Sequence, residues 1–240
     1  MKRLTADQVK LGFIGLGNMG SRIAKRLLDH AYRVSVYDVD RTKVEAVASY
    51  GGVVANNILE LARGVDVLLS CLTNDEAVRS VYTGPGGVLA GAQPGTAVLE
   101  MSTISPETSR EVNRLAAAGG IDVLDVAISG STPAAEEGIL TLLVGGDQKL
   151  FLAAEPIFQA VAKRYFLLGG SGAGTAMKFI ADCSDRSGPL GKAPKGSGQR
   201  LHSAVSIAPN EQGLPVDSEG SGRPAYLNAC HRSGVSRQCR

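Results

Sequence analysis

Three glycines near the amino terminus have the spacing of a phosphate-binding turn. Gly15, Gly17 and Gly20 lie in GLGNMG, after an apolar run and before a helical pattern, which is the context that gives this motif its meaning. The first glycine permits a tight turn, the second lets the backbone approach a pyrophosphate, and the third lets helix and strand pack closely. Free N–H groups at the start of the helix then bind the phosphates. The sequence predicts a dinucleotide site at Gly15, Leu16, Gly17, Asn18, Met19 and Gly20.

An acidic residue at the end of the next predicted strand bears on the choice of dinucleotide. Asp38 follows Gly20 by 18 residues. An acid at about that distance accepts hydrogen bonds from the adenine ribose hydroxyls and repels a 2′-phosphate. Asp38 therefore favours NAD. Arg41 leaves NADP as the alternative, because a guanidinium can pair with a phosphate.

The elements that would position these residues alternate between strands and helices. Near-continuous apolar runs are typical of parallel strands that are covered on both faces. The expected strands are 9–16, 33–38, 65–72, 97–102, 122–129, 140–146 and 165–170, and the expected helices are 21–30, 41–51, 57–64, 105–120 and 147–162. This alternation predicts an α/β fold, a doubly wound, mostly parallel Rossmann-type sheet in a domain spanning 9–169.

The sequence changes character after Asp182. Residues 170–182 have the apolar pattern of a starting helix, whereas 183–240 are rich in Ser, Gly and Arg and hold five of the ten prolines. Such a segment buries too little apolar surface to offset its ordering entropy. We expect a largely disordered tail there.

Composition excludes several classes of protein. The net charge is +2; residues 183–240 hold eight Lys or Arg and four Asp or Glu, and the rest of the chain holds 17 and 19. The body is mildly acidic, so no nucleic-acid partner is expected. The chain has no run of about 18 apolar residues and no apolar leader, so we expect no membrane partner and a cytoplasmic location. The four cysteines match no zinc spacing, and no metal site is expected.

Four stretches together resemble one known family. They are GFIGLGNMGSRIAKRL at 12–27, EMSTISPETSREV at 100–112, DVAISGSTPAAEEGILTLLVGGD at 125–147 and GSGAGTAMKFIAD at 170–182. In order and spacing they are similar to the β-hydroxyacid dehydrogenases. That family includes 3-hydroxyisobutyrate dehydrogenase, tartronate semialdehyde reductase and, more distantly, 6-phosphogluconate dehydrogenase. The resemblance covers about three quarters of the chain.

The resemblance implies roles for positions that the glycine motif does not reach. Leu72 and Thr73 would line the nicotinamide ribose side of the cofactor site, and Thr103 would also touch the cofactor. A substrate loop at Ser129, Gly130 and Ser131 would offer its hydroxyl and N–H groups to a substrate carboxylate, with Ser131 replacing the family's second glycine. Lys178 would be the general acid/base, a role that lysine can fill when burial lowers its pKa.

The chain departs from the family in two places. Asp182, in the substrate-binding set, replaces the family's Asn and lies one helical turn after Lys178, so a negative charge would face the lysine. The family also continues as an inter-domain helix and an all-helical domain of roughly a hundred residues, which 183–240 do not resemble. A shifted reading frame near codon 183 would explain the change in composition, and a native tail is the alternative.

The expected activity is the NAD- or NADP-dependent interconversion of a small 3-hydroxy acid and its semialdehyde or keto form. Its partner is a small-molecule hydroxy acid, whose identity the sequence leaves open. The alternative is a non-catalytic dinucleotide-binding module that lacks the C-terminal domain. The family forms homo-oligomers through that domain, so the oligomeric state of this chain stays open.

Overall fold

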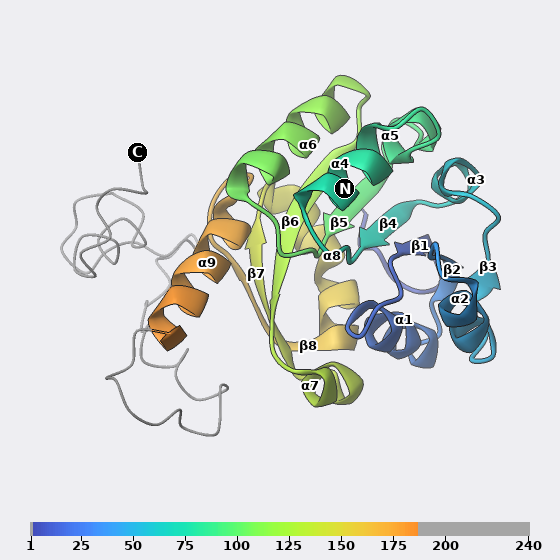
Figure 1. Cartoon of the computed structure of the whole chain (residues 1–240), viewed down its shortest axis with the longest axis horizontal. Helices are drawn as coiled ribbons and strands as arrows, with labels where there is room; N and C mark the ends of the chain where they lie inside the picture. The colour runs from blue at the N-terminus through green and yellow to red at the C-terminus, as the bar shows by residue number, and fades with distance from the viewer. Residues whose placement is uncertain (1, 187–240) are drawn as a thin grey trace. The chain divides into compact units, whose positions relative to one another are not determined.

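An eight-stranded sheet forms the centre of the protein (Figure 1). The structure is a computed structural model that describes residues 2–186, with side chains described as far as Asp182. The sheet order is β3-β2-β1-β4-β5-β6-β7-β8. The strands are β1 Lys10–Ile14, β2 Arg33–Tyr37, β3 Val53–Val54, β4 Val67–Ser70, β5 Ala97–Glu100, β6 Asp122–Ser129, β7 Leu140–Gly145 and β8 Ala162–Leu167.

All neighbouring strands run parallel except β6 and β7, which are antiparallel. The predicted doubly wound, mostly parallel sheet is therefore confirmed. Strand β8 begins at Ala162, three residues before the predicted start at Tyr165. After the buried Ala162, Lys163 and Arg164 are both polar and exposed on this edge strand, so a search for apolar runs misses its start.

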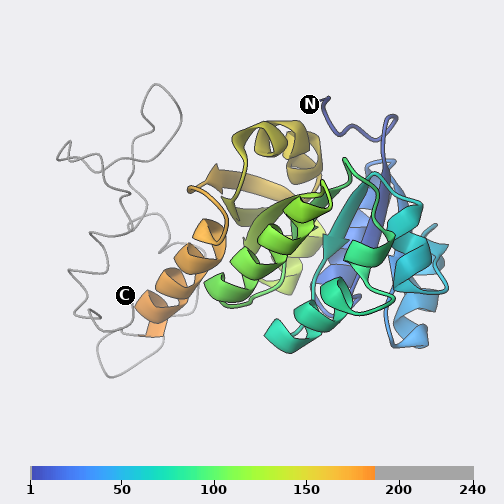
Figure 2. The same ribbon diagram turned by 90° about the horizontal axis from the view of Figure 1, so that it is seen from above.

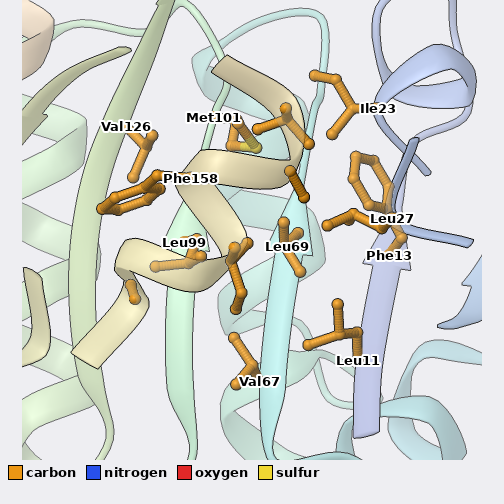
Figure 3. Close-up of a cluster of buried hydrophobic side chains, with 14 of the residues drawn as sticks. Leu11, Phe13, Ile23, Leu27, Val67, Leu69, Leu99, Met101, Val126 and Phe158 are labelled. Carbon is orange, nitrogen blue, oxygen red and sulfur yellow. The ribbon is translucent and has the colours of Figure 1, made fainter. Parts of the chain in front are cut away.

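Helices cover both faces of the sheet (Figure 2). They are α1 Gly20–Asp29, α2 Arg41–Ala48, α3 Ile58–Arg63, α4 Asp75–Thr83, α5 Val88–Gly91, α6 Pro106–Ala118, α7 Thr132–Glu137 and α8 Gln148–Val161. One core cluster joins α1, α2, α7 and α8 to one face, and the other joins α3, α4, α5 and α6 to the opposite face. Figure 3 shows the first cluster, in which Phe158 of α8 lies among Leu69, Leu99 and Val126 of three strands.

Local sequence sets the helix starts. In α6, the Ser105 side chain accepts a hydrogen bond from the Thr108 N–H and Pro106 occupies the first turn, as the sequence predicts. The short elements β3, α4, α5 and α7 were not predicted. Helix α4 buries only Val78 and Tyr82, which is too little apolar periodicity to stand out from its surroundings.

The last described helix, α9, spans Ala173–Arg186 and crosses the boundary between two compact units, which falls after Thr175. The helix therefore runs four residues past Asp182, where the sequence predicted the change to coil. Cys, Ser, Asp and Arg each cost a helix less than about 1 kcal/mol, so a formed helix continues through them. Predictions for 187–240 lie outside the described residues.

Within the part of the chain that the structure describes, no helix is long and apolar enough to cross a membrane. The cytoplasmic location stays a prediction.

Candidate functional site: a nucleotide-binding edge of the sheet

The glycine turn joins β1 to α1, and two of its glycines are required by packing. Gly15 has φ +90°, and a Cβ there would collide with the Cys71 carbonyl oxygen at the end of β4. A Cβ on Gly20 would collide with the Gly15 carbonyl oxygen. These contacts bring the start of α1 close to β1 and β4, and Leu16 is buried beside them.

The middle glycine is different. A Cβ on Gly17 would meet nothing within 4 Å, so no contact inside the protein requires glycine at this position. The open space lies beside the first turn of α1, which has no side-chain cap. In contrast, α2, α3, α4, α6 and α8 are capped by the side chains of Asp40, Asn57, Asn74, Ser105 and Asp147; the short α5 and α7 are also uncapped. An open backbone at an uncapped helix start fits a bound pyrophosphate.

Asp38, directly after β2, contacts this turn. Its Oδ2 accepts a hydrogen bond from the Leu16 N–H at 2.6 Å, and its Oδ1 accepts one from the Asp40 N–H at 2.8 Å. Each carboxylate oxygen can accept a further bond, so ribose hydroxyls could still be bound. Arg41 is the exposed first residue of α2. Asn18 is exposed and Met19 packs against the core.

The residues expected at the nicotinamide side lie on two loops that contact each other. Leu72 follows β4, near Gly15, and its N–H donates to the Ser102 hydroxyl oxygen after β5 at 2.7 Å. Thr73 and Thr103, one residue further along each loop, are exposed. The structure thus brings both loops to the edge of the sheet that carries the glycine turn.

A second link joins these loops further along. The Asp75 carboxylate accepts hydrogen bonds from the Ser105 N–H at 2.9 Å and the Ser105 hydroxyl at 2.6 Å. Thr108 donates to it as well, at 3.0 Å. Burial alone would raise the pKa of Asp75, but these hydrogen bonds outweigh it and hold the pKa below its ordinary value. Asp75 is therefore a charged brace between the starts of α4 and α6.

The predicted substrate loop lies at the end of β6. Ser129 is the last residue of the strand and pairs with Thr141 of β7. Gly130 has φ +151°, and a Cβ there would lie 2.7 Å from Leu140 Cδ2, so the bend requires glycine. Ser131 directly precedes α7 and is exposed, with no capping bond from its side chain.

Helix α7 is tied to α1 by an ion pair. The Glu136 carboxylate accepts from Arg22 Nε at 2.6 Å. Arg22 also donates to the Asn18 carbonyl oxygen at 2.8 Å. The substrate loop is thereby connected, through α7, to the helix that begins at the glycine turn.

Lys178 and Asp182 lie on α9, in the second of the two compact units. Lys178 Nζ is 2.8 Å from Asp182 Oδ1, an ion pair across one helical turn. The predicted approach of a negative charge to the lysine is therefore present. The Lys178 side chain is 17% exposed and the Asp182 side chain 43%.

A row of buried polar residues was not predicted from the sequence. Ser70, Glu100 and Asp125 pair with one another across β4, β5 and β6, and all three are buried. The signal was present in the sequence: β4 reads VLLS, β5 reads AVLE and β6 begins with DVLD. In each of these strands the fourth residue is polar.

Glu100 is the central member of this row. Burial, against hydrogen bonds from Ser102 that act in the opposite direction, raises the pKa of Glu100 to about 7. Its Oε1 accepts from the Ser102 N–H at 2.9 Å, whereas its buried Oε2 has no hydrogen-bond partner among the described residues. Tyr82, whose hydroxyl is 2.6 Å from that of Ser70, also has its pKa raised by burial.

Other candidate sites are weaker. A pocket of 170 Å³, lined in part by Asn113, Asp122 and Gly146, lies at the edge where β6 begins, away from the glycine turn. Among the described residues, no group of three or more His, Cys, Asp or Glu could hold a metal ion.

Comparison with known proteins agrees with this geometry. The model of the NAD binding domain of 6-phosphogluconate dehydrogenase matches residues 10–170. The chain belongs to that family and carries its NAD-binding domain.

Relatives support the assignment. The chain is 36% identical over 172 residues to 2-(hydroxymethyl)glutarate dehydrogenase of Eubacterium barkeri, covering 72% of this chain and 57% of the relative. It is 37% identical over 169 residues to an NAD-dependent L-serine dehydrogenase of Pseudomonas aeruginosa, covering 70% and 57%. The chain thus spans little more than half the length of these relatives.

A solved structure agrees as well. The 3-hydroxyisobutyrate dehydrogenase of Mycobacterium tuberculosis, solved with L-serine, superposes with a TM-score of 0.68 at 32% identity, covering 73% of this chain and 63% of that one. The resemblance to 3-hydroxyisobutyrate dehydrogenases read from the sequence is confirmed.

Proposed function

We propose that this chain derives from an NAD-dependent dehydrogenase of small 3-hydroxy acids, with NAD on the Gly15–Gly20 turn. The observation that carries the proposal is the open space at Gly17 beside the uncapped start of α1. Asp38, fixed against the same turn, supports NAD over NADP. Thr73 and Thr103 would face the nicotinamide.

The substrate class follows from what the relatives' names share. 3-Hydroxyisobutyrate, L-serine and 2-(hydroxymethyl)glutarate each carry a CH₂OH group on the carbon next to a carboxylate and differ in the other substituent. Ser129, Gly130 and Ser131 would bind the common carboxylate.

The reaction needs a proton acceptor and a hydride acceptor. Bound NAD supplies the hydride chemistry. Lys178 would take the hydroxyl proton as the alcohol becomes an aldehyde, and would return it in the reverse direction. Its ion pair with Asp182, at 2.8 Å, occupies the Nζ that would have to reach the substrate hydroxyl.

A second candidate is a chain that binds NAD and does not turn over. The Lys178–Asp182 ion pair favours this candidate, because it occupies the amine that is expected to act as the base. The domains would then be a Rossmann domain over 9–169 and the start of an inter-domain helix, which extends from Ala173 to Arg186 in the structure.

NADH fluorescence titration beside a turnover assay tests both candidates. We expect Gly17→Ala to weaken NADH binding on the order of tenfold, because the methyl group enters the space of the pyrophosphate. Gly86→Ala is the matched control, since its Cβ also meets nothing within 4 Å but lies outside the turn. Equal NADH affinity in the two variants would contradict the proposed cofactor site.

The turnover arm uses 3-hydroxyisobutyrate and L-serine with the full chain. Turnover that is lost in Lys178→Gln, with NADH binding intact, would support the dehydrogenase. Asp182→Asn should raise turnover, because it removes the carboxylate that forms the ion pair with the lysine Nζ. NADH binding with no turnover in any of these proteins would support the binding module.

A further inference from the structure

Burial of the Glu100 carboxyl costs folding free energy, and packing of the strand does not require an acid at this position. The residue is 3% exposed, in a strand whose other members are apolar. One carboxylate oxygen lacks a hydrogen-bond partner. A buried acid with a raised pKa and an unsatisfied oxygen is destabilising, and such groups concentrate where a site needs them.

The other carboxylate oxygen begins a chain of contacts toward the predicted cofactor side. Glu100 Oε1 accepts from the Ser102 N–H at 2.9 Å, and the Ser102 hydroxyl oxygen accepts from the Leu72 N–H at 2.7 Å. The carboxyl thus holds the loop after β5, and that loop holds the loop after β4. Thr73 and Thr103 are the next exposed residues on the two loops.

We propose that Glu100 is a positioning residue for the nicotinamide side of the cofactor site, holding Ser102, and through it Leu72, so that the two loops keep a fixed spacing. The inference rests on the proposed role of Thr73 and Thr103. Glu100 itself touches neither cofactor nor substrate in this proposal; it acts through Ser102.

The groups around Glu100 determine when it is charged. Asp125 faces it from β6, Cys71 from the position directly after β4 and Tyr82 from α4. The Asp125 carboxylate accepts from the N–H groups of Gly172 and Thr175 and from the Thr175 hydroxyl, at 2.7, 3.0 and 3.1 Å. A negative Asp125 adds to burial in disfavouring a second negative charge.

Glu100 therefore changes charge near neutral pH, and its hold on Ser102 changes with it. An ionised carboxylate is a stronger hydrogen-bond acceptor than a neutral acid. Affinity for the cofactor should fall as the pH is lowered through about 7.

The test is NADH titration of the full chain at pH 6 and pH 8. For the wild type we expect a dissociation constant about fivefold higher at pH 6, the difference between a charged and a neutral hydrogen bond. Glu100→Gln should bind NADH about fivefold more weakly than the wild type at pH 8. At pH 6 its affinity should equal that of the wild type. Asp66→Asn is the control: Asp66 Oδ2 accepts from the Lys10 N–H at the opposite end of the sheet, and NADH affinity should stay at the wild-type value at both pH values.

Two further measurements test the contacts that Ser102 makes. Ser102→Ala leaves Glu100 in place but removes the acceptor for Leu72, and should weaken NADH binding at both pH values. Amide hydrogen exchange without cofactor should be faster at Ser102 in Glu100→Gln and at Leu72 in Ser102→Ala.

The outcomes separate the two levels of the argument. Wild-type NADH affinity and pH dependence in Glu100→Gln would overturn the positioning role, while the proposed cofactor site stands. Absence of NADH binding by the wild type would overturn the proposed cofactor site, and the positioning role with it.

Discussion

The two faces of the sheet are made by alternating residues of the same strands, and they differ in chemistry. Leu69 and Leu99 point into the cluster under α1 and α8 (Figure 3). Their neighbours Ser70 and Glu100 belong to the polar row on the other face, together with Asp125. One face is apolar along its length, and the opposite face becomes polar at the ends of β4 and β5.

This difference indicates which face of the sheet stabilises the fold and which face can carry a function. Apolar burial on the first face contributes free energy of folding without directional demands. Buried polar groups contribute only when they are hydrogen-bonded, so they fix the positions of their partners. The polar row is placed where the loops expected to bind the cofactor leave the sheet.

The largest effect should come from the apolar face. Phe158 is 1% exposed and packs its ring against Phe151 and Tyr165, with centroids 5.6 and 5.5 Å away. Phe158→Ala should lower the free energy of unfolding by about 3–5 kcal/mol, equally at pH 5 and pH 8. Urea unfolding measures it. Leu152→Ala, on the same helix but 49% exposed, should change it by less than about 0.5 kcal/mol; equal losses would contradict the assigned core.

The polar face should show a pH dependence instead. The native state keeps a proton on Glu100 up to about pH 7, whereas the unfolded chain releases it near pH 4.5. The stabilising contribution is therefore complete below pH 4.5 and is lost as the pH rises to about 7, a change on the order of 3 kcal/mol.

Urea unfolding of the wild type and Glu100→Gln at pH 5 and pH 8 checks this expectation. The variant cannot titrate at this position, so its free energy of unfolding relative to the wild type should rise with pH. Asp66→Asn is the control: it removes an exposed carboxylate, and so measures how much such a loss alone changes the pH dependence of the free energy of unfolding. A wild-type and variant difference that is the same at both pH values would contradict the assignment.

The smallest effect should come from a helix cap above the polar face. The Ser105 hydroxyl accepts from the Thr108 N–H and donates to Asp75. Ser105→Ala should destabilise the protein by about 1 kcal/mol in thermal or urea unfolding. Ser131→Ala is the matched control for stability, because Ser131 also precedes a helix but makes no capping bond. A loss in Ser131→Ala as large as in Ser105→Ala would argue against the cap.

Much of the fold follows from short-range pattern. The glycine spacing and the Ser105-Pro106 start are local, and the apolar runs place most strands within a few residues. Helix α9 was predicted to stop at Asp182 and reaches Arg186, because weak helix formers do not end a helix that has already formed.

The candidate site was predictable only in part. Gly15 and Gly20 follow from the motif, since a turn and a close helix–strand contact require glycine wherever they occur. That Asp38 bonds to the Leu16 N–H could not be read, because it depends on how β1 and β2 align.

By itself, the sequence determined the strand and helix alternation, the glycine turn and the family, because these depend on residues near one another in the chain. Only the tertiary structure decided that Ser70, Glu100 and Asp125 form one buried row. Sheet register brings together residues from three strands, and no local pattern encodes which of them will be neighbours. The same register places the Glu100 carboxyl beneath the loops expected to hold the cofactor.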